Sequence, residues 1–171
     1  MLLPHPYCAI SHPKPLENGQ KIKLNATQLE GITLRGIKTK EAFTIVDKDG
    51  GYFRASVKQI NAQSGQAIIY EKMFDAPESP IHITLFCAVL GRQRMLTVIQ
   101  KATELGAIRV VPVITEHSVP FEGLAHQKSH AWPKQAIRAA RQCRRASLPE
   151  VQKAISLSEA LQHHCFTKAD M

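Results

Sequence analysis

The sequence lacks the features that mark a membrane protein, a zinc protein or a thiol-disulfide enzyme. No stretch approaches the roughly 18 consecutive apolar residues that a membrane helix requires. The first residues have neither a basic region nor the long apolar run of a signal peptide. The four cysteines form no CxxC pair, and the eight histidines show no HExxH spacing. We therefore expect a cytoplasmic protein with no membrane contact and no metal site.

Acidic residues are scarce relative to basic ones. The sequence has 14 Asp and Glu against 22 Lys and Arg, which gives a formal net charge of +8. Residues 81–171 hold most of this excess, with 12 basic and 6 acidic side chains. A basic surface suits a polyanion such as nucleic acid, because each neutralised phosphate releases counterions. Excess charge is also a common means of keeping a protein in solution, so charge favours a nucleic-acid partner without establishing it.

The first part of the chain is strand-like. Short segments rich in Ile, Val, Phe and Tyr are separated by turn residues, and they read KIKLN, FTIVD, YFRASVKQI and QAIIYEKM. Residues 47–51 supply the turn of a hairpin, and they lack the third oxygen ligand and closing Glu of a calcium loop. The polar, proline-containing stretch 76–80 then reads as a linker. We expect a small all-β domain over residues 1–75.

After Pro80 the pattern changes to that of a βαβ unit. Residues 81–90 form a nearly continuous apolar run, as in a strand buried on both faces of a parallel sheet. A helix is predicted next from one apolar stripe, which consists of Met95, Val98, Ile99, Ala102 and Leu105. Gly106 stands where a glycine commonly ends a helix, and residues 108–114 are the second strand.

A second helix is predicted over residues 131–145. Its apolar stripe contains Trp132, Ala136, Ile137, Ala140 and Cys143. Its polar face contains Lys134, Arg138, Arg141, Gln142 and Arg145, with Arg144 beside them. So many arginines in eight residues favour RNA contact, although a solvated helix face is the alternative. Residues 156–159 form a capping box that predicts a further short helix.

Polar residues 115–118 follow the strand 108–114 directly. Ligands of open parallel sheets bind outside the carboxyl ends of the strands, so this cluster lies where a site is expected. Glu116 is a candidate general base or hydrogen-bonding group, and a structural ion pair with an arginine is the alternative. Yet residues 124–171 contain no glycine and no third apolar run as long as 81–90. Two parallel strands are too few for a stable α/β domain, so this domain looks unfinished.

Several motifs resemble those of the ribosomal RNA small subunit methyltransferase E family. They are Ile99-Gln100-Lys101-Ala102-Thr103-Glu104-Leu105-Gly106, Glu116-x-Ser118, and Gln142-x-x-Arg145 followed by Pro149-Glu150. That family methylates N3 of a uridine in 16S rRNA with S-adenosylmethionine. Its members have an N-terminal PUA-like β-barrel that helps to bind RNA, followed by a SPOUT domain, an α/β domain with a trefoil knot. The resemblance implies an α+β two-domain chain with a PUA-like β-barrel over 1–75, a linker over 76–80 and part of a SPOUT domain over 81–171.

The resemblance and the basic residues together give candidate sites. Glu116 and Arg145 are the catalytic candidates. The RNA-binding candidates are Arg35, Arg92, Arg94, Lys101, Arg138, Arg141, Gln142 and Arg145. For Lys101, a solvated position near a helix C-terminus is an equal alternative. The implied partner is 16S rRNA or the small ribosomal subunit, and a homodimer is implied where the SPOUT domain is complete.

The family's glycine-rich knot segments do not occur in residues 1–171. Those segments wrap the cofactor, so we expect an incomplete SPOUT domain with no cofactor-binding residues in this chain. Two functions therefore stay open. One is S-adenosylmethionine-dependent methylation, and the other is RNA binding by a truncated, catalytically inactive remnant.

Overall fold

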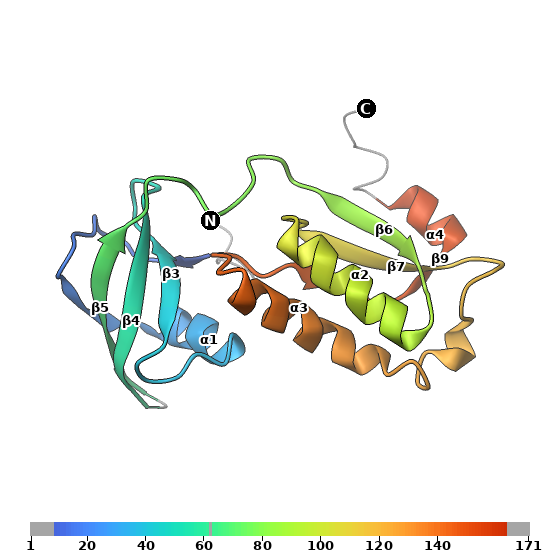
Figure 1. The fold of residues 1–171 in the computed structure, drawn as a ribbon, viewed down its shortest axis with the longest axis horizontal. Coiled ribbons are helices and arrows are strands. Elements are labelled where there is room, and N and C mark those ends of the chain that lie inside the picture. The colour runs from blue at the N-terminus through green and yellow to red at the C-terminus, as the bar shows by residue number, and fades with distance from the viewer. Residues whose placement is uncertain (1–8, 62, 164–171) are drawn as a thin grey trace. The chain divides into compact units, whose positions relative to one another are not determined.

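The computed structural model describes residues 9–61 and 63–163, and their contacts divide the chain into two compact units. The first unit is Met1–Ser79 with Arg141–Leu148, and the second is Pro80–Ala140 with Pro149–Met171. The chain therefore leaves the second unit at Arg141 and returns to it at Pro149. Figure 1 shows the elements of both units, coloured along the chain. The sequence had placed residues 141–148 with the rest of the second half, whereas their contacts group them with the first.

The first unit is built on a five-stranded sheet with the strand order β1-β3-β4-β5-β2. The strands are β1 (Ile10–Ser11), β2 (Lys21–Leu24), β3 (Ala42–Val46), β4 (Tyr52–Ile60) and β5 (Gly65–Lys72). Neighbours are antiparallel, except that β1 runs parallel to β3. The four predicted strands are confirmed as β2 to β5, and β3 and β4 form the predicted hairpin. Within the described residues the sheet ends at β1 and β2, so closure into a PUA-like barrel stays a prediction.

Asp47 builds the turn between β3 and β4. Its Oδ1 accepts hydrogen bonds from the amides of Asp49 at 3.0 Å and Gly51 at 2.8 Å. Gly50 adopts a φ of +81°, which glycine takes without steric cost. The segment is thus a turn, as its sequence predicts. Among residues 9–61 and 63–163, no group of three or more His, Cys, Asp and Glu side chains is arranged to hold a metal ion.

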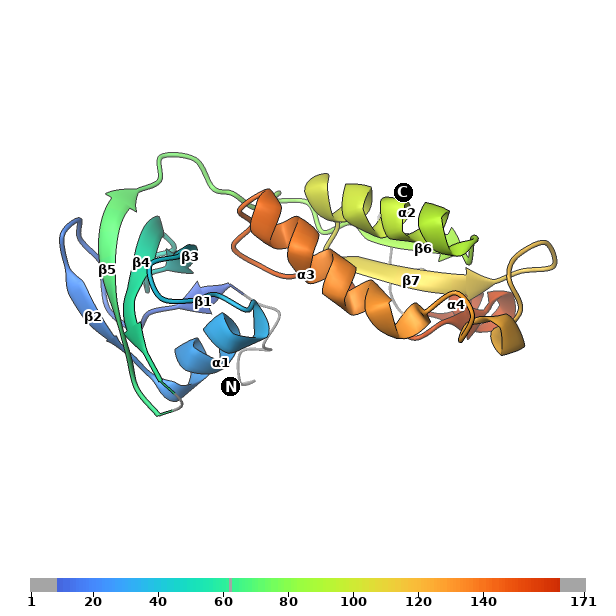
Figure 2. The ribbon, with the colours of Figure 1, turned by 60° about the horizontal axis from the view of Figure 1, so that its bottom comes forward.

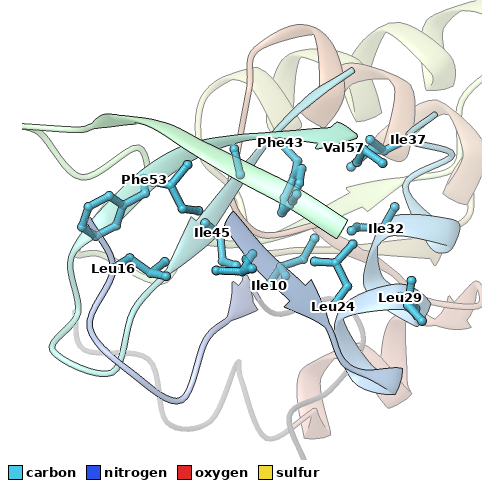
Figure 3. Close-up of a cluster of buried hydrophobic side chains, with 14 residues drawn as sticks. Ile10, Leu16, Leu24, Leu29, Ile32, Ile37, Phe43, Ile45, Phe53 and Val57 are labelled. Atoms are coloured by element: carbon cyan, nitrogen blue, oxygen red, sulfur yellow. The ribbon is translucent and has the colours of Figure 1, made fainter. Parts of the chain in front are cut away.

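The core of the first unit follows from the alternation of side chains along its strands. Phe53, Ala55 and Val57 of β4 point to the same face, because successive strand residues point to opposite faces. They pack with Ile45 of β3 and with Ile32 of the helix α1 (Ala26–Leu34), as Figure 3 shows for most of these side chains. Burial of this apolar surface is the main force that holds the unit together.

The sequence analysis did not predict α1. The helix begins at a capping box, in which the side chain of Asn25 accepts from the amide of Gln28 and the side chain of Gln28 accepts from the amide of Asn25. Because Gly31 has no side chain, α1 can pack closely against Ile10 of β1, since a Cβ at position 31 would lie 3.1 Å from Cγ1 of Ile10. Glycine and β-branched residues are weak helix formers, which explains why local pattern did not reveal this helix.

The second unit contains a parallel sheet in the order β6-β7-β8, with β9 also paired to β7. The strands are β6 (Thr84–Ala88), β7 (Arg109–Ile114), β8 (Glu150–Val151) and β9 (Ile155–Ser156). The helix α2 (Arg92–Glu104) connects β6 to β7, which confirms the predicted βαβ unit. The expectation of only two strands was wrong, because β8 and β9 also belong to the sheet. The sequence did not reveal them because each has two residues, too few for a long apolar run.

Helices cover both faces of this sheet. On one face lie α2 and α3 (Trp132–Gln142), where Met95, Ile99 and Trp132 pack on Val110. On the other lies α4 (Leu157–Gln162), as Figure 2 shows. Ala160 of this helix packs with residues of β6 and β7. The predicted capping box of α4 is confirmed at Ser156 and Glu159. Over the described residues, none of the helices has the length and apolar character needed to cross a lipid bilayer.

The ends of α2 and α3 correct two details of the sequence analysis. Leu105, assigned to the buried stripe of α2, is exposed, because the helix ends there and Gly106 turns the chain with a φ of +92°. Helix α3 ends at Gln142, short of the predicted residue 145. Cys143 is therefore exposed and Arg145 buried, the reverse of the prediction, because residues beyond the helix no longer follow its period.

Candidate functional site

The polar cluster 115–118 forms a tight turn at the carboxyl end of β7. The hydroxyl of Ser118 accepts a hydrogen bond from the amide of Thr115 at 2.8 Å and donates to its carbonyl at 3.1 Å. This arrangement leaves Glu116 and His117 exposed at the tip. Within the described part of the chain, the Glu116 carboxylate has no ion pair, so the alternative of a structural pair with an arginine finds no support.

A small apolar hollow lies beside this turn. It has a volume of about 180 Å³, and the lining residues are Phe86, Ala88, Val113, Thr115, Leu157, Ala160 and Leu161. They come from β6, β7 and α4, so the hollow lies at the carboxyl edge of the sheet where the fold predicts a ligand. Thr115 supplies the single side-chain hydroxyl of this lining.

Arg145 belongs to the first unit, where it pairs with Glu78. Its Nη2 donates to Oε2 of Glu78 at 2.8 Å, and only 4% of the Arg145 side chain and 16% of the Glu78 side chain are exposed. The other carboxylate oxygen, Oε1, accepts from the amides of Ala146 at 2.7 Å and Ser147 at 2.9 Å. The hydroxyl of Ser147 donates to Oε2 at 2.7 Å. Glu78 is thus the anchor of the loop that follows α3.

The pKa of Glu78 reports this environment. Burial alone would raise the pKa, because it disfavours the charged carboxylate. The hydrogen bonds from Arg145 and Ser147 outweigh burial and lower the pKa below its ordinary value. Glu78 is therefore a carboxylate at neutral pH, and the charge of Arg145 is compensated.

Two further arginines and a threonine hold the same loop. Arg35 donates through Nη1 to the carbonyl of Gly31 at 3.1 Å and through Nη2 to the carbonyl of Ala146 at 3.0 Å. Thr44 lies opposite Arg54 in the hairpin and accepts a hydrogen bond from it at 2.7 Å. The side chains of both Thr44 and Arg54 contact the carbonyl of Arg144 at 3.5 Å. Arg35 and Arg145, predicted to contact RNA, are thus buried and bonded within the first unit.

The remaining predicted RNA-binding side chains are exposed. They are Arg92, Arg94, Lys101, Arg138, Arg141 and Gln142. Lys101 forms an ion pair with Glu104 at 2.7 Å, and Arg141 forms one with Glu41 at 3.1 Å. The predicted site residues are thus divided between the two units. The second unit contains Glu116, Arg138 and the exposed basic residues of α2. The first unit contains Arg35, Arg141, Gln142 and Arg145. The sequence analysis did not identify Arg54 as a candidate site residue. Its sequence showed only that it lies in a predicted strand.

Residues 77–169 match the sequence model of the RNA methyltransferase domain, and the chain belongs to this family. Among curated proteins, it is 27% identical over 144 residues to ribosomal RNA small subunit methyltransferase E of Aquifex aeolicus, which covers 84% of this chain and 62% of that protein. The protein of the same name from Buchnera aphidicola subsp. Schizaphis graminum is 28% identical over 119 residues and is covered to 48%. The resemblance to the ribosomal RNA small subunit methyltransferase E family is thereby confirmed. The chain spans about half to two thirds of the length of these relatives.

Two solved structures give the same result. A ribosomal RNA small subunit methyltransferase E from Neisseria gonorrhoeae, bound to S-adenosyl methionine, is 27% identical with a TM-score of 0.54. A putative methyltransferase from Legionella pneumophila, in complex with the cofactor SAM, is 29% identical with a TM-score of 0.53. Each comparison covers 90% of this chain and 65% of the other. The mixed α/β architecture is therefore confirmed, and the trefoil knot stays a prediction.

Proposed function

We propose that this protein takes part in the methylation of N3 of a uridine in 16S rRNA, with S-adenosylmethionine as methyl donor. The observation that carries the proposal is the match of residues 77–169 to the RNA methyltransferase domain. The described part of that segment builds a βαβ unit with a polar turn at its carboxyl edge. The relatives named above support ribosomal RNA as substrate, and the two cofactor-bound structures support S-adenosylmethionine.

The hollow beside the Thr115 turn does not by itself form a complete pocket for this cofactor. A hollow of about 180 Å³ is smaller than the roughly 300–1,000 Å³ of typical ligand sites. Its lining is apolar apart from Thr115, so it offers few partners for the polar groups of the cofactor. We therefore derive no catalytic step through the cofactor from these residues.

In the proposed reaction, Glu116 acts on the uridine. Methylation of N3 requires loss of its proton, and an exposed carboxylate at the carboxyl edge of the sheet is suited to accept it or to orient the base. Arg145 acts indirectly in this proposal, because its guanidinium is occupied by Glu78. It positions the loop after α3 and its neighbour Arg144.

The exposed basic side chains are the proposed contacts to RNA phosphates. Arg92, Arg94 and Lys101 lie on α2, and Arg138 lies on α3. Arginine and lysine bind phosphates without reading sequence, so these contacts orient the RNA and the uridine is selected elsewhere. The partner proposed is 16S rRNA or the small ribosomal subunit in the cytoplasm. A homodimer is part of the same proposal, and sedimentation of the purified protein tests it.

The test is to delete the coding gene in its host and to map methylated uridines in 16S rRNA by mass spectrometry. We expect one N3-methyluridine to disappear and to return when the intact gene is supplied, but not when it encodes Glu116→Gln. An unchanged methylation pattern in the deletion strain would overturn the proposal.

A second candidate function is RNA binding without catalysis, and the small volume of the hollow favours it. Calorimetric titration of the purified protein with S-adenosylmethionine separates the two. Micromolar affinity supports the methyltransferase. No heat of binding, together with RNA affinity that falls as salt increases, supports the second candidate.

A further inference from the structure

Arg144 is held in a backbone conformation that a non-glycine residue rarely adopts. Its φ is +58°, in the left-handed region, where the Cβ of an L residue crowds the following carbonyl oxygen. Such a conformation persists only when the surroundings fix it, and here they do. The carbonyl of Arg144 contacts Thr44 and Arg54, and the next three residues are bonded to Glu78 and Arg35. These contacts hold the backbone of the loop in place, and the Arg144 side chain is exposed.

The fixed loop brings Arg144 next to Arg54. Arg54 lies in β4 between the core residues Phe53 and Ala55, so its side chain emerges on the opposite, outer face of the sheet. Its Nη1 lies 2.7 Å from Oγ1 of Thr44 and 3.5 Å from the carbonyl of Arg144. Burial lowers the pKa of Arg54, and the positive charge of Arg144 lowers it further. Two guanidinium groups thus lie close enough to repel each other.

No carboxylate in the described residues forms an ion pair with either arginine. Glu71 is the cross-strand neighbour of Arg54 and favours its charged form, but it lies beyond ion-pair distance. Tyr70 precedes Glu71 in β5, at the point where the pairing of β5 with β4 shifts register after Arg54. Tyr70 is 48% exposed. The first unit therefore carries two arginines whose positive charges act on each other, Arg54 and Arg144, together with the exposed ring of Tyr70.

We propose that Arg54, Arg144 and Tyr70 form a binding site for single-stranded RNA, in which the two guanidiniums bind a backbone phosphate and the tyrosine ring stacks on a base. An anionic phosphate relieves the repulsion between the two guanidiniums, and the planar donors of arginine match its oxygen atoms. An aromatic ring beside a phosphate site is the usual arrangement for binding unpaired nucleotides. The site deepens the proposed function and rests on it for the identity of the RNA, since its residues belong to the first unit and the polar turn at Glu116 to the second.

The preorganised loop explains why the protein tolerates the strain at Arg144. A guanidinium on a fixed backbone loses less conformational freedom on binding than one on a mobile loop, so more of the interaction energy remains as affinity. Glu78 and Arg145 thereby act as positioning residues for the phosphate contact.

The test is fluorescence anisotropy of a short, labelled single-stranded RNA titrated with the full chain at several salt concentrations. Arg144→Gly removes the guanidinium and places the preferred residue at a positive φ, so the variant is expected to fold at least as well as the parent. We expect about tenfold weaker binding and a decrease of about 0.7 in the slope of log affinity against log salt. Lys128→Gly is the matched control, since Lys128 also has a positive φ of 52° and is exposed in the second unit.

Tyr70 provides an independent arm. Tyr70→Ala is expected to weaken RNA binding by at least about fivefold, because stacking on one base is lost, whereas Tyr70→Phe retains the ring and the affinity. Binding by Arg144→Gly that equals that of Lys128→Gly would overturn the site. Because these assays measure RNA affinity alone, an inactive protein with the expected affinity losses would refute the proposed methylation and leave the site standing.

Discussion

Glu78 and Arg145 are 67 positions apart in the sequence and form a buried ion pair, with Nη2 of the arginine 2.8 Å from Oε2 of the glutamate. The same carboxylate binds two backbone amides and a hydroxyl of the following residues. Glu78, which precedes the second unit in the sequence, thus fixes a loop that follows most of that unit in the sequence.

Replacing Glu78 with alanine is expected to destabilise the first unit by about 3–5 kcal/mol, because it removes one partner of a buried ion pair. Glu41→Ala is the control, since it breaks the exposed pair with Arg141 and should cost less than about 1 kcal/mol. Urea denaturation followed by circular dichroism measures both. Equal losses in the two variants would contradict the structural role assigned to Glu78.

Acid should remove the contribution of Glu78. Its pKa is lowered in the folded protein, so its stabilising effect is present above the ordinary carboxyl pKa of 4.5 and is lost as the pH falls through the folded value. The difference in unfolding free energy between the parent and Glu78→Gln should therefore shrink between neutral pH and about pH 3. Parallel urea titrations at each pH give this difference, and a gap that widens toward acid would refute the assignment.

Glu116→Gln is expected to lower the rate of RNA methylation by roughly 10²–10⁴-fold, the range for loss of a general base. Stability should change little, because the side chain is exposed and unpaired within the described residues. Transfer of tritium from labelled S-adenosylmethionine to small ribosomal subunits measures the rate. His117→Ala, which alters the adjacent exposed residue, should retain most of the activity.

Gly65→Ala is expected to destabilise the first unit by about 1–3 kcal/mol through overpacking. An added Cβ would lie 2.8 Å from Cδ1 of Leu24 and 2.9 Å from Cδ2 of Leu29, both within the core. Thermal unfolding of this variant can be compared with that of Gln66→Ala, which changes the exposed neighbour. A Tm equal to that of the parent would show that the two leucines move aside freely.

The sequence predicted elements whose pattern is local and strong. Alternation identified the hairpin of β3 and β4, and the stripe through Met95 and Ile99 identified α2. The strands β8 and β9 were missed because two-residue strands carry no periodicity, and their place is set by pairing with β7.

The candidate site was predictable in its location and less so in its contacts. The turn at Glu116 follows from its place after a buried strand. The burial of Arg35 and Arg145 follows from partners distant in sequence, such as Ala146 for the first and Glu78 for the second. An arginine bonded inside a protein and one exposed to a ligand look the same in a basic segment of sequence.

The passage of the chain into the first unit at Arg141 and out again at Pro149 has a consequence for synthesis. Proteins are made from the N-terminus, and domains commonly fold as they leave the ribosome. Here the five-stranded sheet can form early, but the segment that satisfies Glu78 emerges only after β6, α2, β7 and nearly all of α3. The first part of the molecule to be made is therefore among the last to be completed.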